Sequence, residues 1–284
     1  NANYWIEKYH VDGLRVDAGV YPERLRAAID AGWHTGKELP GSAGLGHVGA
    51  MKLISDGSLN TRSAYCSTPY SGIEPLTYGT LSYTPQQIED YMRLATEHGF
   101  DIACHAIGDE ANTIALNAVA ATHAHGSIEH AQMLKPVDIP RFAELGLTAS
   151  IQPQHAMDDR DVITRFWANP AGIPYPFRAL HDAGTTLRMG SDAPVAPLDP
   201  WLAISAAVLG TESSAREPFQ PEQCLDVHTS LAASTATGRD RLASGDPADV
   251  VLLDADPYAA DTPEAMRAMP QHVVMTLLCG ERTY

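Results

Sequence analysis

Four residues able to bind a metal or move a proton lie within, or directly after, short apolar runs in the middle of the chain: Lys52, His105, His130 and Asp192. Imidazole nitrogens and carboxylate oxygens are ligands of zinc and related ions, which activate a bound water for hydrolysis. Lys52 is the unusual member, because an ammonium group inside an apolar strand is costly unless it is paired or modified. Together these residue types predict a metal site for hydrolytic chemistry.

Each of these residues also has a simpler explanation when it is taken alone. A single histidine after a strand is more often a loop or packing residue than a ligand. Asp192 precedes Ala193 and Pro194, a sequence that also suits a turn. The occurrence of all four residues on successive strand-like segments favours the metal site over these separate explanations.

Strands and helices alternate between about residues 45 and 210, and this alternation must position the four residues. One helix begins at Pro85, since Thr84 and Gln87 match a capping box, and it ends at Gly99. Strands that alternate with helices are parallel, and reactive groups gather where such strands end. The pattern fits either a closed (β/α)₈ barrel or an open doubly wound sheet. The predicted strands are 50–54, 100–105, 127–130, 147–152 and 185–190.

Other histidines carry a weaker signal. His123 and His125 precede the strand that ends at His130, so His125 is expected about 16 Å from His130, near the opposite end of that strand. We interpret this pair as surface residues. His155 follows the strand 147–152, and it is either a substrate contact or a loop residue.

The chain is acidic, with 35 Asp and Glu against 19 Lys and Arg in 284 residues and a formal net charge of −16. Its basic residues are scattered, so we expect no binding to nucleic acid or to anionic membranes. The longest apolar runs are too short to cross a bilayer, and we expect no secretory leader. Four dispersed cysteines without a CxxC pair predict reduced thiols in a cytoplasmic protein. We expect a homodimer, although no interface is visible in the sequence.

The C-terminal end of the chain differs from the rest. Residues 1–244 are expected to form one domain, which holds the alternating strands and helices and a further strand at 14–20. Residues 245–284 are expected to form a second, smaller unit with two strands, at 250–253 and 273–278.

Five segments in this order are similar to those of the amidohydrolase superfamily. The resemblance is to its amidohydrolase-3 branch, which includes YtcJ-like proteins and N-substituted formamide deformylase. Lys52–Arg62 resembles the K-x-x-x-DGSL-x-x-R segment of that branch, and the last segment resembles a strand of the small β-sandwich that accompanies such barrels. The five segments are Lys52–Arg62, His105–Asp109, Ile128–Gln132, Gly190–Val195 and Gly245–Asp254.

The resemblance implies a distorted (β/α)₈ barrel, incomplete at its N-terminal side, followed by strands of a β-sandwich. It implies one or two divalent metals, zinc first among them, held by His105, His130, Asp192 and a carboxylated Lys52. A carbamate on Lys52 is anionic, so it removes the cost of burying an ammonium group. Metal-bound hydroxide would attack a C–N carbonyl, and Asp192 would take the proton and return it to the leaving amine. Substrate or supporting contacts are expected from His155, Arg62 and Asp56.

The family also uses a His-x-His pair on the first barrel strand. Before Lys52 this sequence has only His10, His34 and His47, each standing alone. We therefore expect the chain to be the C-terminal portion of a longer protein, without the first two barrel strands. A partial barrel leaves open sheet edges and exposed core, which favours association.

The predicted function is metal-dependent hydrolysis of a non-peptide C–N bond, of the amide or N-formyl type, in a small-molecule substrate. One alternative is a non-catalytic or inactive truncated scaffold, which the retention of all four candidate ligands argues against. Another is a phosphotriesterase-like or esterase-like hydrolase on the same barrel, which differs only in the bond that is cleaved. The sequence does not define the substrate, because specificity depends on the loops.

Overall fold

A computed structural model describes the chain except for residues 1–20, 43–45, 168–169 and 236–237. The strand predicted at 14–20 lies outside the described residues. The described chain divides into two compact units. We call them the sheet unit, with residues 21–151 and 158–188, and the C-terminal unit, with residues 152–157 and 189–284.

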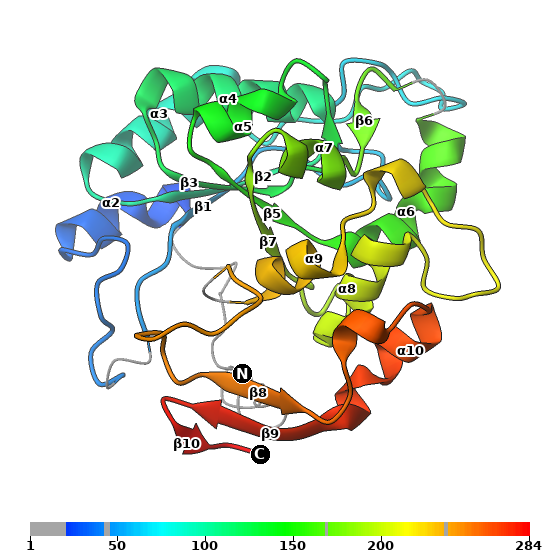
Figure 1. Ribbon diagram of the computed structural model, residues 1–284. Helices are drawn as coiled ribbons and strands as arrows, with labels where there is room; N and C mark the ends of the chain where they lie inside the picture. Colours follow the sequence, from blue (N-terminus) through cyan, green and yellow to red (C-terminus); the bar gives the residue numbers. More distant parts are fainter. Residues whose placement is uncertain (1–20, 43–45, 168–169, 236–237) are drawn as a thin grey trace. The chain divides into compact units, whose positions relative to one another are not determined.

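The sheet unit is built on five strands that neighbour one another in chain order (Figure 1). The pairings from the first to the fourth strand are parallel. This spatial order is the one that a (β/α) barrel requires, and it differs from the order of a doubly wound sheet. Among the described residues the sheet is open, with the first and last strands at its edges. The strands are β1 (Met51–Ile54), β2 (Ile102–Ala106), β3 (Gly126–His130), β5 (Thr148–Ile151) and β7 (Thr186–Met189).

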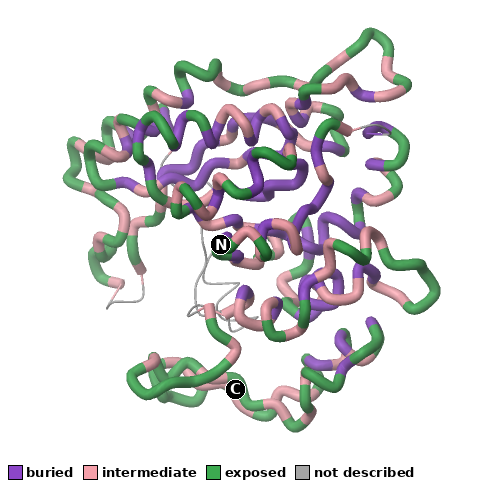
Figure 2. Tube along the Cα trace, turned by 45° about the horizontal axis from the view of Figure 1, so that its top comes forward, coloured by how far each residue is buried: buried purple, intermediate pink, exposed green. Residues whose placement is uncertain are grey.

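One row of side chains across this sheet is apolar and has no exposure to solvent. It is covered by helices, since α3 and α4 contact β2 and α5 contacts β5, and in Figure 2 the strands form the buried centre of this unit. Burial of such side chains is the main source of its stability. We call Leu53, Cys104, Ile128 and Ala149 the apolar row.

The next row lies one residue further along each strand, so its side chains point to the opposite face. This row carries a histidine, a carboxylate and a hydroxyl, which are the side chains of the sheet that could bind a metal or transfer a proton. We call Ile54, His105, Glu129 and Ser150 the polar row.

Helices between the strands provide the parallel crossovers. The predicted capping box is confirmed: the Thr84 side chain accepts from the Gln87 backbone, and the Gln87 side chain accepts from the Thr84 backbone. Helix α3 then buries Ile88, Met92 and Ala95 along one face. The helices that lie wholly or partly in this unit are α2 (Pro22–Asp30), α3 (Pro85–Glu97), α4 (Asp109–Thr122), α5 (Ile139–Glu144), α6 (Pro153–Phe166) and α7 (Phe177–Asp182).

Helix α6 corrects the interpretation of His155 as a loop residue. The helix begins at Pro153, two residues after β5 ends, and His155 lies in its first turn. Proline is well suited to a first helical turn, because it lacks the N–H that has no partner there and its φ angle is already helical.

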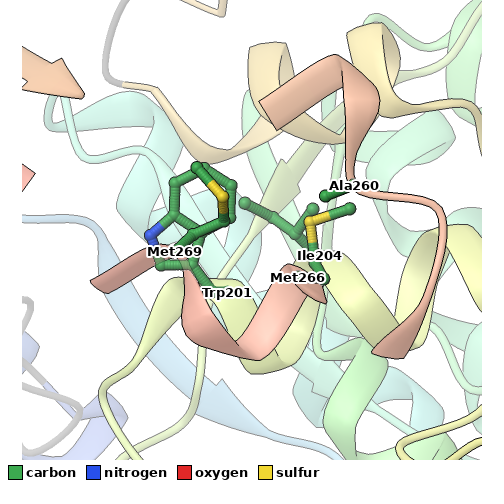
Figure 3. Packing of buried hydrophobic residues seen from close by; sticks show 5 residues of the cluster. All are labelled: Trp201, Ile204, Ala260, Met266 and Met269. Atoms are coloured by element: carbon green, nitrogen blue, oxygen red, sulfur yellow. The ribbon is translucent and has the colours of Figure 1, made fainter. Parts of the chain in front are cut away.

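The C-terminal unit contains α8 (Pro200–Leu209), α9 (Val227–Ser234) and α10 (Pro263–Ala268). Helices α8 and α10 pack against each other through a cluster of large apolar side chains (Figure 3). Met266 is fully buried in this cluster, and Asp199 caps α8 by accepting from the backbone N–H of Trp201. The cluster consists of Trp201, Ile204, Ala260, Met266 and Met269.

A three-stranded antiparallel sheet follows, formed by β8 (Val250–Leu253), β9 (Val273–Leu278) and β10 (Glu281–Arg282). The two strands predicted here are confirmed, and β10 adds a short third strand. Val251, Leu252 and Val274 on this sheet are exposed. The β-sandwich stays a prediction. In the described part of the chain, no helix has the length and apolar character that a membrane span requires.

Candidate active site

The ends of β2 and β3 bring His105 and His130 together in the sheet unit. Their ring centroids are 4.5 Å apart, with the ring planes tilted by 68°. His130 is 6% exposed, and His105 is partly buried. The structure therefore places two of the predicted ligands side by side.

The backbone at His130 is what allows this contact. His130 pairs with Ala106, so strand alternation alone would put its side chain on the face opposite to His105. His130 and Ala131 both have positive φ angles, of 73° and 44°, which end the alternation. Such conformations cost about 1–3 kcal/mol for residues other than glycine, and they cluster at functional sites.

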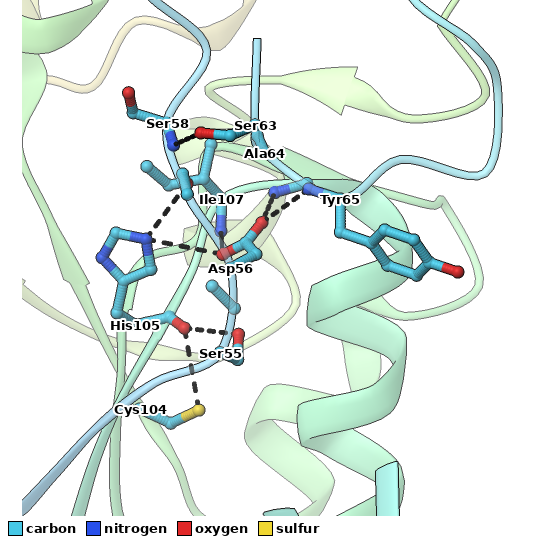
Figure 4. Close-up of polar contacts among 12 residues, drawn as sticks. Ser55, Asp56, Ser58, Ser63, Ala64, Tyr65, Cys104, His105 and Ile107 are labelled. Atoms are coloured by element: carbon cyan, nitrogen blue, oxygen red, sulfur yellow. Dashed lines mark hydrogen bonds and ion pairs between the residues drawn. The ribbon is translucent and has the colours of Figure 1, made fainter. Parts of the chain in front are cut away.

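Asp56 and Gly57 fix the tautomer of His105 (Figure 4). The Nε2 atom of His105 lies 3.2 Å from the carbonyl oxygen of Gly57 and 3.4 Å from Oδ1 of Asp56. A carbonyl oxygen can only accept, so Nε2 carries the proton and donates it to this oxygen. The lone pair of the neutral ring is then on Nδ1, which is the nitrogen able to bind a metal.

Asp56 is held by the backbone around it. Its carboxylate accepts from the N–H groups of Tyr65, Ile107 and Gly108 at 2.9–3.1 Å, and the residue is 1% exposed. This burial favours a positioning role through His105 over direct contact with a substrate. Burial raises the pKa of Asp56 to about 7, against the opposing effect of the three backbone donors.

Two glycines of the matched segments are required by close packing. A Cβ atom on Gly57 would lie 2.0 Å from Oγ of Ser63, and one on Gly108 would lie 2.0 Å from the carbonyl oxygen of Tyr65. Asp109 ties the same loop down, because both of its carboxylate oxygens accept from Ser67. The segments after β1 and β2 therefore form one packed support beneath His105.

Lys52 lies on the same face of the sheet as the polar row. It precedes Ile54 by two residues and pairs with Ala103, which precedes His105 by two. Lys52 is 4% exposed. This position is consistent with the predicted role of Lys52 as a metal ligand, and the carboxylation of Lys52 remains a proposal.

Glu129 is a candidate that sequence reasoning missed. It is fully buried in the polar row, and Oε1 accepts a hydrogen bond of 2.5 Å from Oγ of Ser127. The signal was present in the segment Ile128–Gln132, where the glutamate stands directly before His130. The residue types alone give no reason to expect a buried glutamate here. The pairing of Glu129 with His105 and Ser150 on the neighbouring strands shows that it lies in the polar row.

The C-terminal unit holds two further predicted residues, His155 and Asp192. Nε2 of His155 lies 3.4 Å from Oδ2 of Asp192. Asp192 has a φ angle of 55°, a conformation that aspartate adopts more readily than most residues. The histidine is thus placed to orient the carboxylate of Asp192.

Arg62 lies on the loop after β1, and it is exposed. Its guanidinium donates to the carbonyl oxygen of Asn60 at 3.2 Å and lies 5.4 Å from the ring centroid of Phe166. Its contact with substrate stays a prediction.

The donors of the sheet unit fit a divalent metal. His105 and His130 supply two adjacent imidazoles, and His105 has the oriented Nε2–H that metal-binding histidines typically donate to a carbonyl or carboxylate oxygen. An ammonium on Lys52 could not bind a cation, whereas a carbamate could. Nitrogen and carboxylate-type oxygen donors suit zinc, iron, manganese or cobalt.

A five-stranded sheet in barrel order with histidines at its strand ends is the framework of a metal-dependent hydrolase. The amidohydrolase family model matches residues 13–284. The chain belongs to this family.

Relatives and solved structures agree with this assignment. The Bacillus subtilis (strain 168) protein YtcJ, an amidohydrolase by name, is 31% identical over 75% of this chain and 43% of its own length. The N-substituted formamide deformylase of Arthrobacter pascens is 25% identical over 76% of this chain and 42% of its own. A crystal structure of an uncharacterized metal-dependent hydrolase from Pyrococcus horikoshii is 28% identical, with a TM-score of 0.69 over 83% of this chain and 48% of that one. The chain thus spans about half the length of these proteins.

Proposed function

We propose that this chain carries ligands and the proton-transfer group of a metal-dependent hydrolase that cleaves a non-peptide C–N bond. The observation that carries the proposal is the pair of histidines at the ends of β2 and β3, with Nε2 of His105 donating to Gly57. A packing histidine would also need an acceptor for its N–H, but it would not require a second imidazole beside it and a left-handed backbone at His130 to bring that ring there. The juxtaposition of the two rings supports a metal-binding role over the inactive scaffold.

The residues have separate tasks in this proposal. His105, through Nδ1, and His130 hold a divalent cation, and Lys52 joins them as a carbamate. When it is bound, the cation would polarise the carbonyl group of the substrate and activate a water for attack. Asp192 accepts the proton of the water and returns it to the leaving amine, and His155 orients Asp192 for this transfer.

N-substituted formamides are the first substrates to assay, because one relative is a deformylase by name. Simple amides, esters and phosphotriesters complete the panel. Turnover of esters or phosphotriesters in place of amides would support the alternative hydrolase. No turnover of any of them, with zinc bound, would support the inactive scaffold.

The experiment that tests the site is a measurement of metal content together with carbamate formation on Lys52. We expect zinc to bind the purified protein, and labelled bicarbonate to give a carbamate signal in carbon NMR that Lys52→Arg abolishes. Lys135→Arg is the matched control, since Lys135 is a partly buried lysine whose ammonium group is already paired with Glu110. Failure to bind any divalent metal, or a carbamate signal unaffected by Lys52→Arg, would contradict the proposal.

A further inference from the structure

Two segments with left-handed backbone meet just after β3. His130 and Ala131 have φ angles of 73° and 44°, and Tyr175 has a φ angle of 48°. The backbone N–H of Tyr175 donates to the carbonyl oxygen of Gln132 at 2.5 Å, and two short antiparallel strands continue this contact. Residues other than glycine keep such φ angles only where the surrounding structure holds them. The two strands are β4 (Met133–Leu134) and β6 (Ile173–Pro174).

The side chains of Gln132 and Tyr175 form a closed triangle with the carboxylate of Asp159 on α6. Nε2 of Gln132 donates to Oδ2 of Asp159 at 3.0 Å and to the hydroxyl oxygen of Tyr175 at 2.5 Å. The hydroxyl of Tyr175 donates to the same Oδ2 at 2.6 Å. All three residues are 5% exposed or less. Burial and the adjacent carboxylate of Asp159 raise the pKa of Tyr175, so this hydroxyl keeps the proton that it donates.

The other oxygen of Asp159 is bound by the loop after β1. Nδ2 of Asn60 donates to Oδ1 of Asp159 at 2.6 Å. Asn60 lies inside a turn that is closed by a hydrogen bond of 3.2 Å from the N–H of Gly57 to the carbonyl oxygen of Ser63. The carbonyl oxygen of Gly57 is the one that accepts from Nε2 of His105. A movement of Asn60 would therefore be transmitted to the group that orients His105.

Asp159 is thus the common acceptor for the two segments that hold the predicted ligands. Gln132 follows His130 by two residues, and Asn60 follows the partner of His105 by three. Because breaking one of these bonds leaves a buried polar group unsatisfied, the network holds both segments in one geometry. Hydrogen bonds within either segment would stabilise that segment alone, whereas a shared carboxylate fixes one segment relative to the other.

We propose that Asp159 is a positioning residue of the candidate metal site, which keeps His130 beside the ring of His105. It acts on the two rings through Gln132 and Asn60. Without the carboxylate the triangle opens, and His130 loses the support that stabilises its left-handed backbone. The inference rests on the proposed function, because it assigns Asp159 to the placement of two metal ligands.

Structures of the metal-free protein and of Asp159→Ala, together with zinc affinities measured by competition with a chelator, test this role. The ring centroids of His105 and His130 are 4.5 Å apart in the unaltered chain. We expect them to separate by about 1 Å or more in Asp159→Ala, a displacement large enough to impair a ligand set. The dissociation constant for zinc should rise about 10–100-fold, as it does when a group that orients a metal ligand is lost.

Two milder variants keep the test decisive if Asp159→Ala does not fold. Asp159→Asn retains an oxygen that can accept from Gln132 and Tyr175, so it should keep the rings in contact and lose less zinc affinity. Tyr175→Phe keeps the buried ring and removes only the hydroxyl from the triangle. It should weaken zinc binding by about fivefold, the effect of one hydrogen bond.

Asp138→Ala is the matched control, because Asp138 is a buried carboxylate of the same unit with partners on other segments. It is 2% exposed, accepts from Oγ1 of Thr113 at 2.5 Å and pairs with Arg141 at 2.7 Å. Denaturant unfolding should show that Asp138→Ala and Asp159→Ala are both destabilised. Only Asp159→Ala should separate the rings and lose zinc affinity. If Asp159→Ala is destabilised with unchanged rings and affinity, as expected for Asp138→Ala, the positioning role is refuted.

The two readouts separate this inference from the proposed function. If the unaltered protein binds no zinc, yet Asp159→Ala separates the rings and Asp138→Ala does not, the proposed function fails and the positioning role stands. If the protein binds zinc, and neither Asp159→Ala nor Tyr175→Phe changes the ring contact or the affinity, the inference fails and the proposed function stands.

Discussion

The two rows of the five-stranded sheet are one residue apart on the same strands, yet they serve different purposes. The apolar row is closed to solvent and covered by helices, whereas the polar row carries His105 and Glu129. Strands β2 and β3 thus each contribute one buried apolar side chain to stability and the next side chain to the candidate site. The difference shows that a shift of one residue in register would exchange the core and the site.

Replacement of His130 should have the largest effect on chemistry. We expect His130→Asn to lower metal content and to reduce amide hydrolysis by at least about 10³-fold, because a ligand to the activating metal is lost. Asparagine tolerates the positive φ angle at this position, so the fold should persist. Metal analysis and kinetic assays measure both effects.

His123→Asn is the matched control for that change. His123 is an exposed histidine with a φ angle of 54° at the end of α4. It should keep full metal content and activity. Equal activity of the two variants would show that His130 is not a ligand.

Replacement of Ile128 should have the largest effect on stability. Ile128→Ala in the apolar row should lower the free energy of unfolding by about 2–5 kcal/mol, through lost burial and the cavity left behind. The same substitution at Ile54, which is partly exposed in the polar row, should cost less than half as much. Denaturant unfolding compares the two, and equal costs would show that the rows do not differ in burial.

Asp56 follows β1 and contacts Nε2 of His105, a member of the polar row. Asp56→Asn at pH 8, above the pKa of about 7, removes a buried charge that opposes folding but places an NH₂ group among backbone donors, so we expect these opposing effects to leave the free energy of unfolding nearly unchanged. Metal affinity should fall about 10–100-fold, because His105 loses an orienting partner. Asp90→Asn on the surface of α3, where Asp90 accepts from Gln86, is the control and should change neither quantity. Unchanged metal affinity in Asp56→Asn would argue against its positioning role.

The smallest effects should come from hydroxyl exchange between adjacent residues of β5. Ala149→Ser adds a hydroxyl to the apolar row and should cost about 1–3 kcal/mol, since the site is fully buried. Thr148→Val removes a hydroxyl from the opposite, partly exposed face and should stay within about 0.5 kcal/mol. Thermal unfolding of both variants gives the difference, and a reversed order would contradict the assignment of the two faces.

Local patterns predicted the strands well, since each short apolar run is a continuous segment whose residue types and bounding turns are read from neighbouring residues. The capping box at Thr84 is equally local, and the structure confirms it. Helix α6 was missed because its first turn follows β5 after a single residue, Gln152, and carries no separate turn sequence.

Contacts between distant parts of the chain could not be predicted in this way. Asn60 and Asp159 are 99 positions apart, and Asp56 meets Gly108 across 52 positions. Nothing in the spacing of residues specifies which backbone N–H groups surround a given carboxylate. The positioning role of Asp56 and the network around Asp159 therefore became visible only in three dimensions.

The sequence by itself determined which segments form strands, because residue type and local periodicity are properties of neighbouring residues, and the resemblance of five segments indicated the family and the residues that could bind a metal. The tertiary structure decided that the strands neighbour one another in barrel order. The tertiary structure decided which face of the sheet each side chain occupies, since register is set by pairing between strands. It also decided that His130, despite its place in the register, contacts the ring of His105 through a left-handed turn of the backbone. That turn is costly in isolation, and the packing of the folded chain around it supplies the compensating free energy.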